Sequence, residues 1–191
     1  PITMPQPEYV KINNLLKTSI VTAGNRKAAY LLYNSFGEDD TQDLQQAMTQ
    51  LAAEQPTDVI LDLRYNPGGY VNTSMVLASM LAPAEAVGKT YINLLYNDKR
   101  EEKTTFLIDA AYRTGGTTFS YNNLYIITSG ETASASEAVI NGLKPYMQGK
   151  LFQVGTATFG KNLGQELFNS EEAPQLNFWL TTFYLANSEG F

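Results

Sequence analysis

The sequence predicts an α/β fold built as one domain, and three observations support that class. The chain has 191 residues, of which 43% are hydrophobic and 17% charged, so it can bury one sizeable core. Short apolar segments typical of buried strands alternate with segments in which apolar residues recur at helical spacing. Clusters of Gly, Pro and Asn separate these segments as turns. Strands that alternate with helices are typical of a buried sheet covered by helices.

The first half of the chain contains two strand–helix pairs. Apolar residues recur at Leu44, Met48 and Leu51, which predicts an amphipathic helix that ends before Pro56. Residues 1–27 are polar and proline-rich at their start, so we expect an N-terminal arm or linker there and the domain over residues 28–191. The elements expected in this half are a strand at 28–36, a helix at 41–55, a strand at 58–63, a turn at 66–69 and a helix at 71–81.

The second half repeats this pattern after a predicted hairpin. Two apolar segments flank a polar turn, which predicts hairpin strands at residues 90–96 and 101–108. A buried strand then leads through a loop of small residues into a helix that ends near Pro145. The elements expected are a strand at 124–128, a loop at 129–133, a helix at 134–146, a strand at 151–154, a glycine-bearing loop at 156–164, and strands at 165–168 and 177–185.

Composition excludes several classes of function. The net charge of −6 and the lack of a dense Lys/Arg cluster argue against a nucleic-acid surface. The chain has no histidine and no cysteine, so it cannot build a Ser-His-Asp triad, a Cys-His dyad, a disulfide or a zinc site of the usual kind. We expect no metal and no cofactor, and no apolar run approaches the roughly 20 residues that span a bilayer. A catalytic base would have to be Lys, Asp, Glu or Tyr.

Three loops that follow short apolar strands carry glycine or small residues. They lie at residues 61–69, 128–137 and 158–165. In α/β sheets, loops at the carboxyl ends of strands are where ligands bind. We therefore expect these three loops to form a site.

The second loop places Ser134 at the start of a predicted helix. Backbone N–H groups are unpaired there and the helix dipole favours negative charge, so an oxyanion or a serine alkoxide would be stabilised. Ser134 and Glu137 also form the pattern S-x-x-E, which is typical of a capping box. The two interpretations are compatible, because one serine can cap the helix and still present its hydroxyl.

The third loop contains Lys161, and Gln165 follows four residues later. A loop lysine is ordinarily only solvated, but a serine nucleophile in a histidine-free chain needs another base, and lysine is the known alternative. Gln165 could hold the amine towards the serine. In the first loop, Gly68 and Gly69 form either a tight turn or a donor for an oxyanion opposite the N–H of Ala135.

The motifs LDLRYNPGG at residues 61–69, TASASE at 132–137 and TFGKNLGQ at 158–165 resemble, in that order, the C-terminal processing peptidases, also called tail-specific proteases. The resemblance extends from about Ala28 to about Leu185. The segment AVINGLKPY at residues 138–146 is most similar to exported members from Bacteroidetes-type bacteria.

The resemblance implies a core with the ββα spiral of the ClpP and crotonase folds and a serine endopeptidase with a Ser-Lys-Gln site. By motif position Ser134 is the nucleophile, with Ser136 as the second candidate, and Lys161 is the base with Gln165. The oxyanion donors are the N–H of Ala135 and one N–H from Gly68 or Gly69, which the motif does not separate.

The family also implies protein or peptide substrates, cleavage near C-termini and an extracytoplasmic location, periplasmic or lipoprotein-anchored. Members usually carry a peptide-docking PDZ domain, and we expect it, like a signal peptide, outside this chain. One departure is Lys144-Pro145, where relatives often have Gln-Asp. Two alternatives remain: an inactive binding module on the same fold, and a crotonase-type acyl-CoA enzyme with similar oxyanion turns.

Overall fold

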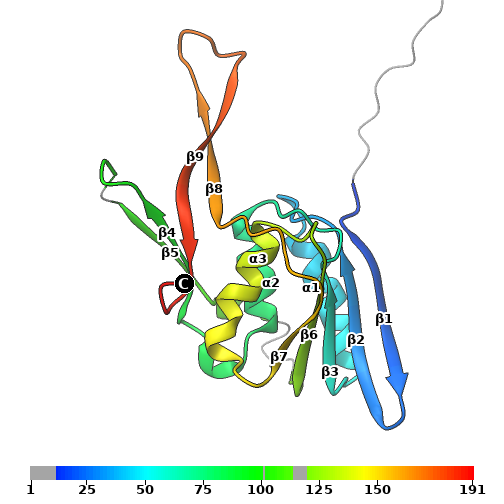
Figure 1. Ribbon diagram of the computed structural model, residues 1–191. Coiled ribbons are helices and arrows are strands. Elements are labelled where there is room, and N and C mark those ends of the chain that lie inside the picture. The colour runs from blue at the N-terminus through cyan, green and yellow to red at the C-terminus, as the bar shows by residue number, and fades with distance from the viewer. Residues whose placement is uncertain (1–11, 101, 114–119) are drawn as a thin grey trace, which may run out of the picture.

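The computed structural model describes residues 12–100, 102–113 and 120–191, and these form two sheets with helices between and around them (Figure 1). The strands are β1 (Leu15–Ala23), β2 (Arg26–Tyr33), β3 (Asp58–Asp62), β4 (Thr90–Tyr96), β5 (Lys103–Leu107), β6 (Asn123–Thr128), β7 (Leu151–Gly155), β8 (Leu163–Asn169) and β9 (Asn177–Ala186). The α-helices are α1 (Thr41–Ala53), α2 (Val71–Leu81) and α3 (Ala135–Leu143). Short 3-10 turns lie at Ala84–Ala86, Ala110–Tyr112 and Lys144–Tyr146. The predicted α/β class is confirmed.

The first sheet has the strand order β1-β2-β3-β6-β7. Strands β2, β3, β6 and β7 are parallel, and only β1 pairs in the antiparallel sense. Inward side chains of β2, β3 and β6, among them Leu31, Leu61 and Ile126, are fully buried in the core. Because the strands are parallel, the loops that follow β3 and β6 leave the sheet at the same edge.

The second sheet is antiparallel with the order β5-β4-β9-β8. Helix α3 packs against α2 on one side and against β4 and β9 on the other, so it joins the two sheets. The hairpin of β8 and β9 continues beyond the body of the molecule as an arm (Figure 1). Large apolar side chains on this arm are exposed, among them Leu167, Phe168, Phe178, Trp179 and Leu180.

The N-terminal segment differs from the expected arm or linker. Residues 1–11 lie outside the described residues, but β1 occupies Leu15–Ala23 and pairs with β2 through a turn at Gly24. For residues 15–23 the structure therefore shows an edge strand in place of the predicted arm or linker. An edge strand of this kind is hard to recognise in the sequence. Most side chains of β1 are exposed, including the apolar Leu16 and Val21, so the sequence lacks the alternation of apolar and polar residues that marks a strand packed on a core.

Smaller differences concern the ends of elements. The helix expected at 134–146 ends at Leu143 and continues as a 3-10 turn, Lys144–Tyr146, because Pro145 interrupts the α-helical ladder. The strand expected at 165–168 begins earlier, at Leu163. Glu101, placed at the start of a hairpin strand, lies outside the described residues, and β5 spans Lys103–Leu107.

Gly142 tests how tightly α3 packs. A Cβ at this position would lie 2.5 Å from two ring carbons of Tyr91, a side chain that is fully buried. The hydroxyl of Tyr91 donates a hydrogen bond to Ser74 Oγ at 3.0 Å, which ties the ring in place. Gly→Ala inside a helix ordinarily stabilises by about 1 kcal/mol, but overpacking a core costs about 1–3 kcal/mol.

We therefore expect Gly142→Ala to lower the melting temperature, measured by circular dichroism. Gly130→Ala is the control, because a Cβ at Gly130 meets no atom within 4 Å. A melting temperature for Gly142→Ala at or above that of the wild type would show that the helix and Tyr91 are not in close contact.

Asp58 provides a pH-dependent contribution to stability. Its buried carboxylate accepts hydrogen bonds from Arg26 (2.7 and 2.9 Å), Asn123 (2.8 Å) and Thr57 (3.0 Å). Burial raises the pKa of Asp58, but these hydrogen bonds, that of Arg26 foremost, outweigh it and hold the pKa below its ordinary value. A lowered pKa in the folded state stabilises above the unfolded pKa of about 3.9, and this stabilisation disappears as pH falls through the folded value.

We expect Asp58→Asn to be less stable than the wild type at pH 7 and to lose less stability than the wild type between about pH 4 and pH 2. Urea unfolding at several pH values measures both effects. Asp98→Asn is the control, because the side chain of Asp98 is 85% exposed. Parallel pH profiles for the wild type and Asp58→Asn would contradict this role of Asp58.

Candidate active site

The turn after β3 and the loop after β6 are joined around Asn66, which is fully buried. The Asn66 side chain donates to the carbonyl of Tyr33 at 3.1 Å and accepts from the N–H of Gly68 at 2.9 Å. Its main-chain carbonyl accepts from the N–H of Ala133 at 3.1 Å and from Ser136 Oγ at 3.0 Å. One residue thus joins the end of β2, the glycine turn and the loop that leads into α3.

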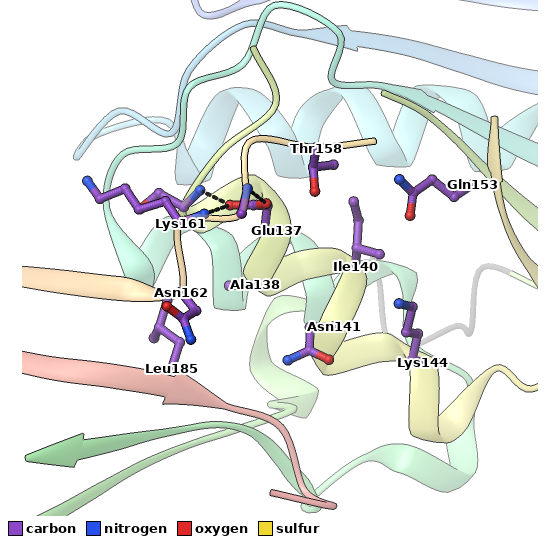
Figure 2. A pocket seen from close by; sticks show the side chains of 12 residues that line it. Glu137, Ala138, Ile140, Asn141, Lys144, Gln153, Thr158, Lys161, Asn162 and Leu185 are labelled. Carbon is purple, nitrogen blue, oxygen red and sulfur yellow. Dashed lines mark hydrogen bonds between the residues drawn. The ribbon is translucent and has the colours of Figure 1, made fainter. Parts of the chain in front are cut away.

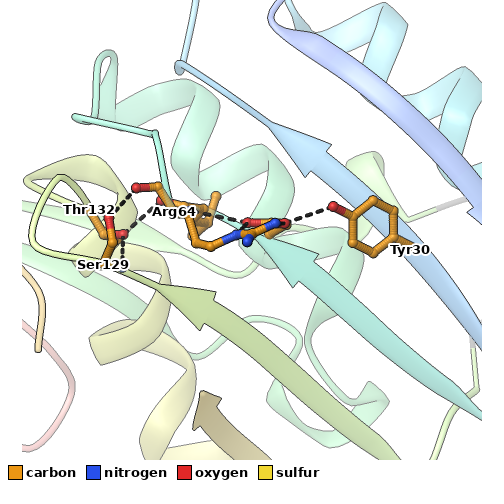
Figure 3. Close-up of polar contacts among 6 residues, drawn as sticks. Tyr30, Arg64, Ser129 and Thr132 are labelled. Atoms are coloured by element: carbon orange, nitrogen blue, oxygen red, sulfur yellow. Dashed lines mark hydrogen bonds and ion pairs between the residues drawn. The ribbon is translucent and has the colours of Figure 1, made fainter. Parts of the chain in front are cut away.

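Two further side chains join the same loops (Figure 3). Thr132 Oγ1 donates to the carbonyl of Leu63 at 2.7 Å, and Ser129 Oγ donates to the carbonyl of Arg64. The loops at residues 61–69 and 128–137 therefore lie side by side, as the sequence predicts.

Asp62 and Arg64 form an ion pair where β3 ends. The Asp62 carboxylate is fully buried and accepts from Tyr30 Oη at 2.7 Å and from Arg64 Nε at 3.0 Å and Nη2 at 2.7 Å (Figure 3). Burial raises the pKa of Asp62, but the hydrogen bonds from Arg64 and Tyr30 outweigh this effect and hold the pKa below its ordinary value. The ion pair holds the chain where β3 ends and the turn begins.

Ser134 lies at the N-terminus of α3 in a conformation that is rare for a residue with a side chain, with φ 56° and ψ −116°. Its N–H donates to Glu137 Oε2 at 2.8 Å, which is the glutamate half of the predicted capping box. Strained backbone of this kind persists only where the surroundings enforce it, and it is concentrated at functional sites.

Ser136, the second candidate nucleophile, has a different environment. Its side chain is fully buried, and its Oγ donates to the carbonyl of Asn66. Ser134, by contrast, is half-buried and lines a cavity. The geometry therefore assigns Ser136 to the structure of the loop and leaves Ser134 as the accessible hydroxyl.

The two glycines of the turn, Gly68 and Gly69, also have different environments. Gly68 has φ +108°, and a Cβ there would lie 2.7 Å from Ser134 Cβ and 3.0 Å from the nitrogen of Ala135. The N–H of Gly68 is already bonded to Asn66. Within residues 12–100, 102–113 and 120–191, the N–H groups of Gly69 and Ala135 have no hydrogen-bond acceptor. Gly68 thus supplies space beside Ser134, whereas Gly69 and Ala135 supply free donors.

The loop with Lys161 is tied to α3. The N–H of Gly160 donates to Glu137 Oε1 at 2.6 Å and the N–H of Lys161 donates to Glu137 Oε2 at 2.8 Å. The N–H of Phe159 donates to the carbonyl of Thr132 at 2.9 Å. The capping pattern predicts only that Glu137 accepts from the N–H of Ser134. The bonds of Glu137 with Gly160 and Lys161 are therefore not predicted from the sequence.

Ser134, Lys161 and Gln165 line one cavity of about 640 Å³, together with Gly69. Its walls are largely apolar and come from the second sheet, from α2 and from the segment after β2; they include Phe36, Val71, Leu94, Phe106, Trp179 and Phe183. The sequence-predicted catalytic side chains are therefore brought to one place from α3, from a loop and from β8.

A second cavity of about 320 Å³ also reaches Ser134 and Lys161 and has a polar lining that includes Asn141, Lys144 and Gln153 (Figure 2). The Lys161 side chain extends away from Lys144 and Gln153 in this view. In the described part of the chain, no hydrogen bond joins the side chains of Lys161 and Ser134. The two residues share a cavity, but their side chains are not hydrogen-bonded to each other among the described residues.

Other kinds of site find little support. Among the residues that the structure describes, no group of three or more carboxylates could hold a metal ion. None of the helices described is both long and apolar enough to cross a membrane.

Comparison with known proteins places these features in a family. Residues 27–190 match the model described as Peptidase family S41. The chain is 28% identical over 142 residues to a carboxyl-terminal-processing protease of Picosynechococcus sp., which covers 74% of this chain and 31% of that protein. It is 25% identical over 185 residues to the chloroplastic carboxyl-terminal-processing peptidase 3 of Arabidopsis thaliana, which covers 95% of this chain and 33% of that protein.

The fold resembles a crystal structure described as an S41 protease from Bacteroides fragilis, with a TM-score of 0.86 and 28% identity over 98% of this chain and 50% of that chain. It also resembles the photosystem II D1 C-terminal processing protease, with a TM-score of 0.69 and 22% identity over 95% of this chain and 46% of that chain, a likeness of fold alone. The chain spans about a third of these curated relatives and half of the Bacteroides protease chain. Because the family model matches most of the chain, the chain belongs to peptidase family S41.

Proposed function

We propose that this chain is the catalytic core of a serine endopeptidase that hydrolyses peptide bonds by acyl transfer from the substrate to Ser134 and then to water, with Lys161 as the general base. The observation that carries the proposal is the cavity that Ser134, Lys161 and Gln165 line together. The strained Ser134 backbone and the free N–H groups of Gly69 and Ala135 support it. The names of the relatives agree with peptidase activity.

In the proposed mechanism, neutral Lys161 takes the proton of Ser134 as Oγ attacks the substrate carbonyl. Gln165 holds the amine towards the serine. The protonated Lys161 then donates its proton to the leaving amine, and water repeats the sequence on the acyl-enzyme. Since the two side chains are not hydrogen-bonded here, Lys161 must rotate about its side-chain bonds to reach Ser134. Catalytic contacts often tighten only when substrate is bound.

We assign the oxyanion donors to the N–H groups of Ala135 and Gly69. The N–H of Gly68 is excluded as a free donor, because it is bonded to the side chain of Asn66 at 2.9 Å. Because Gly68 has no Cβ, the space in front of the Ala135 nitrogen stays open. A Cβ on residue 68 would lie 3.0 Å from that nitrogen. Loss of one oxyanion donor typically lowers the rate by about 10²–10³.

The proposed substrates are proteins or peptides cleaved near their C-termini, as the names of the relatives suggest. The apolar walls of the 640 Å³ cavity favour an apolar substrate side chain next to the scissile bond. An extracytoplasmic location, periplasmic or lipoprotein-anchored, remains a proposal that rests on family resemblance alone.

A catalytically inactive binding module is the second candidate. The missing hydrogen bond between Ser134 and Lys161 favours it, since an uncoupled serine is a weak nucleophile. The acyl-CoA alternative loses its basis, because the chain belongs to a peptidase family.

A serine-directed fluorophosphonate and a denatured protein substrate distinguish these candidates. We expect the wild type to be labelled and to cleave, and Ser134→Ala to do neither. Lys161→Ala should abolish cleavage with a nearly unchanged melting temperature, because Lys161 makes no side-chain hydrogen bond within the described residues. Ser136→Ala is the matched control: it should keep both activities and lose about 1 kcal/mol of stability. A folded wild type without label would favour the binding module.

Gly68→Ala should lower the rate of labelling by about 10²-fold or more, because the new Cβ would crowd Ser134 and the oxyanion position. Gly88→Ala controls for backbone strain. Gly88 also has a positive φ, +78°, but a Cβ there meets no atom within 4 Å. Equal labelling rates in the two variants would overturn the assignment of Gly68.

A further inference from the structure

We propose that Glu137 is a positioning residue: its carboxylate fixes the backbone of the Lys161 loop against the backbone of Ser134. The inference rests on the proposed function of Ser134 and Lys161. Its basis is a set of three hydrogen bonds to one side chain, drawn in Figure 2.

The carboxylate of Glu137 accepts from both segments at once. Oε2 receives the N–H of Ser134 and the N–H of Lys161, each at 2.8 Å, and Oε1 receives the N–H of Gly160 at 2.6 Å. Bonds from backbone N–H to a carboxylate are short and about twice as strong as neutral ones. The nucleophile and the base therefore have their main chains bonded to the same oxygen atom.

This arrangement exceeds the needs of a helix cap. In a capping box the glutamate side chain accepts one bond, from the N-cap N–H, and here Ser134 donates it. The bonds from Gly160 and Lys161 come from outside the helix. In the described residues Glu137 has no Lys or Arg side chain as a partner, so backbone N–H groups and the start of α3 stabilise its charge.

Among the described residues, the other backbone bonds to the lysine loop hold its flanks. The N–H of Phe159 bonds to Thr132, and the carbonyl of Asn162 accepts from the N–H of Leu185 at 2.8 Å. The two residues between these flanks, Gly160 and Lys161, donate their N–H groups to Glu137. Glu137 thus sets the backbone position of Lys161.

Glu137→Gln tests the inference with the smallest change of shape. The amide keeps one acceptor oxygen, and its NH₂ group cannot accept a backbone N–H, so at least one of the three bonds is lost. We expect kcat for peptide cleavage to fall by about 10²-fold with little change in KM, since a small misplacement of a catalytic group costs about that much. Glu131→Gln, an exposed glutamate in the same loop region, is the matched control and should behave as the wild type.

A double-mutant cycle separates positioning from general stability. If Glu137 acts through Lys161, Glu137→Gln should not lower the residual rate of fluorophosphonate labelling further in a Lys161→Ala background. Additive losses, or wild-type kcat in Glu137→Gln, would overturn the inference. A wild type that neither labels nor cleaves would instead remove the proposed function, so the two failures are distinct.

Amide hydrogen exchange measured by NMR gives a readout independent of activity. In the wild type, the N–H groups of Gly160 and Lys161 should be protected, and in Glu137→Gln their exchange should accelerate by about 10-fold or more. The N–H of Phe159, which bonds to Thr132, should change little. Equal exchange at both Gly160 and Lys161 in the two proteins would contradict the role of Glu137 even if the variant were inactive through partial unfolding.

Discussion

The buried amide of Asn66 is the constraint on which the rest of the site depends. The side-chain amide donates to the carbonyl of Tyr33 at the end of β2 and accepts from the N–H of Gly68. The main-chain carbonyl of Asn66 accepts from Ala133 and Ser136, in the segment that leads into α3. Each of these bonds lies away from water, so replacing the Asn66 side chain would remove its bonds with Tyr33 and Gly68, at a cost of about 1–3 kcal/mol for each group left unpaired. The position of Ser134 and the free N–H of Gly69 both follow from this junction.

The site is divided between the two layers of the fold. The first sheet and α3 supply Ser134 and the N–H donors, whereas the loop before β8 and β8 itself supply Lys161 and Gln165. Glu137 is one polar connection between these layers, and the apolar residues of the 640 Å³ cavity line the space between them. The chemistry therefore depends on how the layers are held together as much as on the residues themselves.

The sequence predicts the buried parts of this structure well, because burial leaves a periodic pattern. Strands β3 and β6 and helix α1 follow from apolar spacing, and the motif residues do line one cavity. Strand β1 was missed because an exposed edge carries no such pattern. The distinction between Gly68 and Gly69 depends on a hydrogen bond from Asn66 that no spacing encodes, and the orientation of Lys161 depends on side-chain rotation. The location and the PDZ domain stay predictions.

The strand order has a consequence for how the molecule is made. Residues that meet in the site come from positions 66–69, 134–137 and 160–165, and the parallel pairs among β2, β3, β6 and β7 join segments far apart in the chain. Contacts of this kind form slowly, because long loops must close first. During synthesis the N-terminal part emerges first, so Ser134 is made before the lysine that would activate it. A nascent or half-folded chain therefore lacks the assembled site, and the proposed proteolysis would require the folded chain.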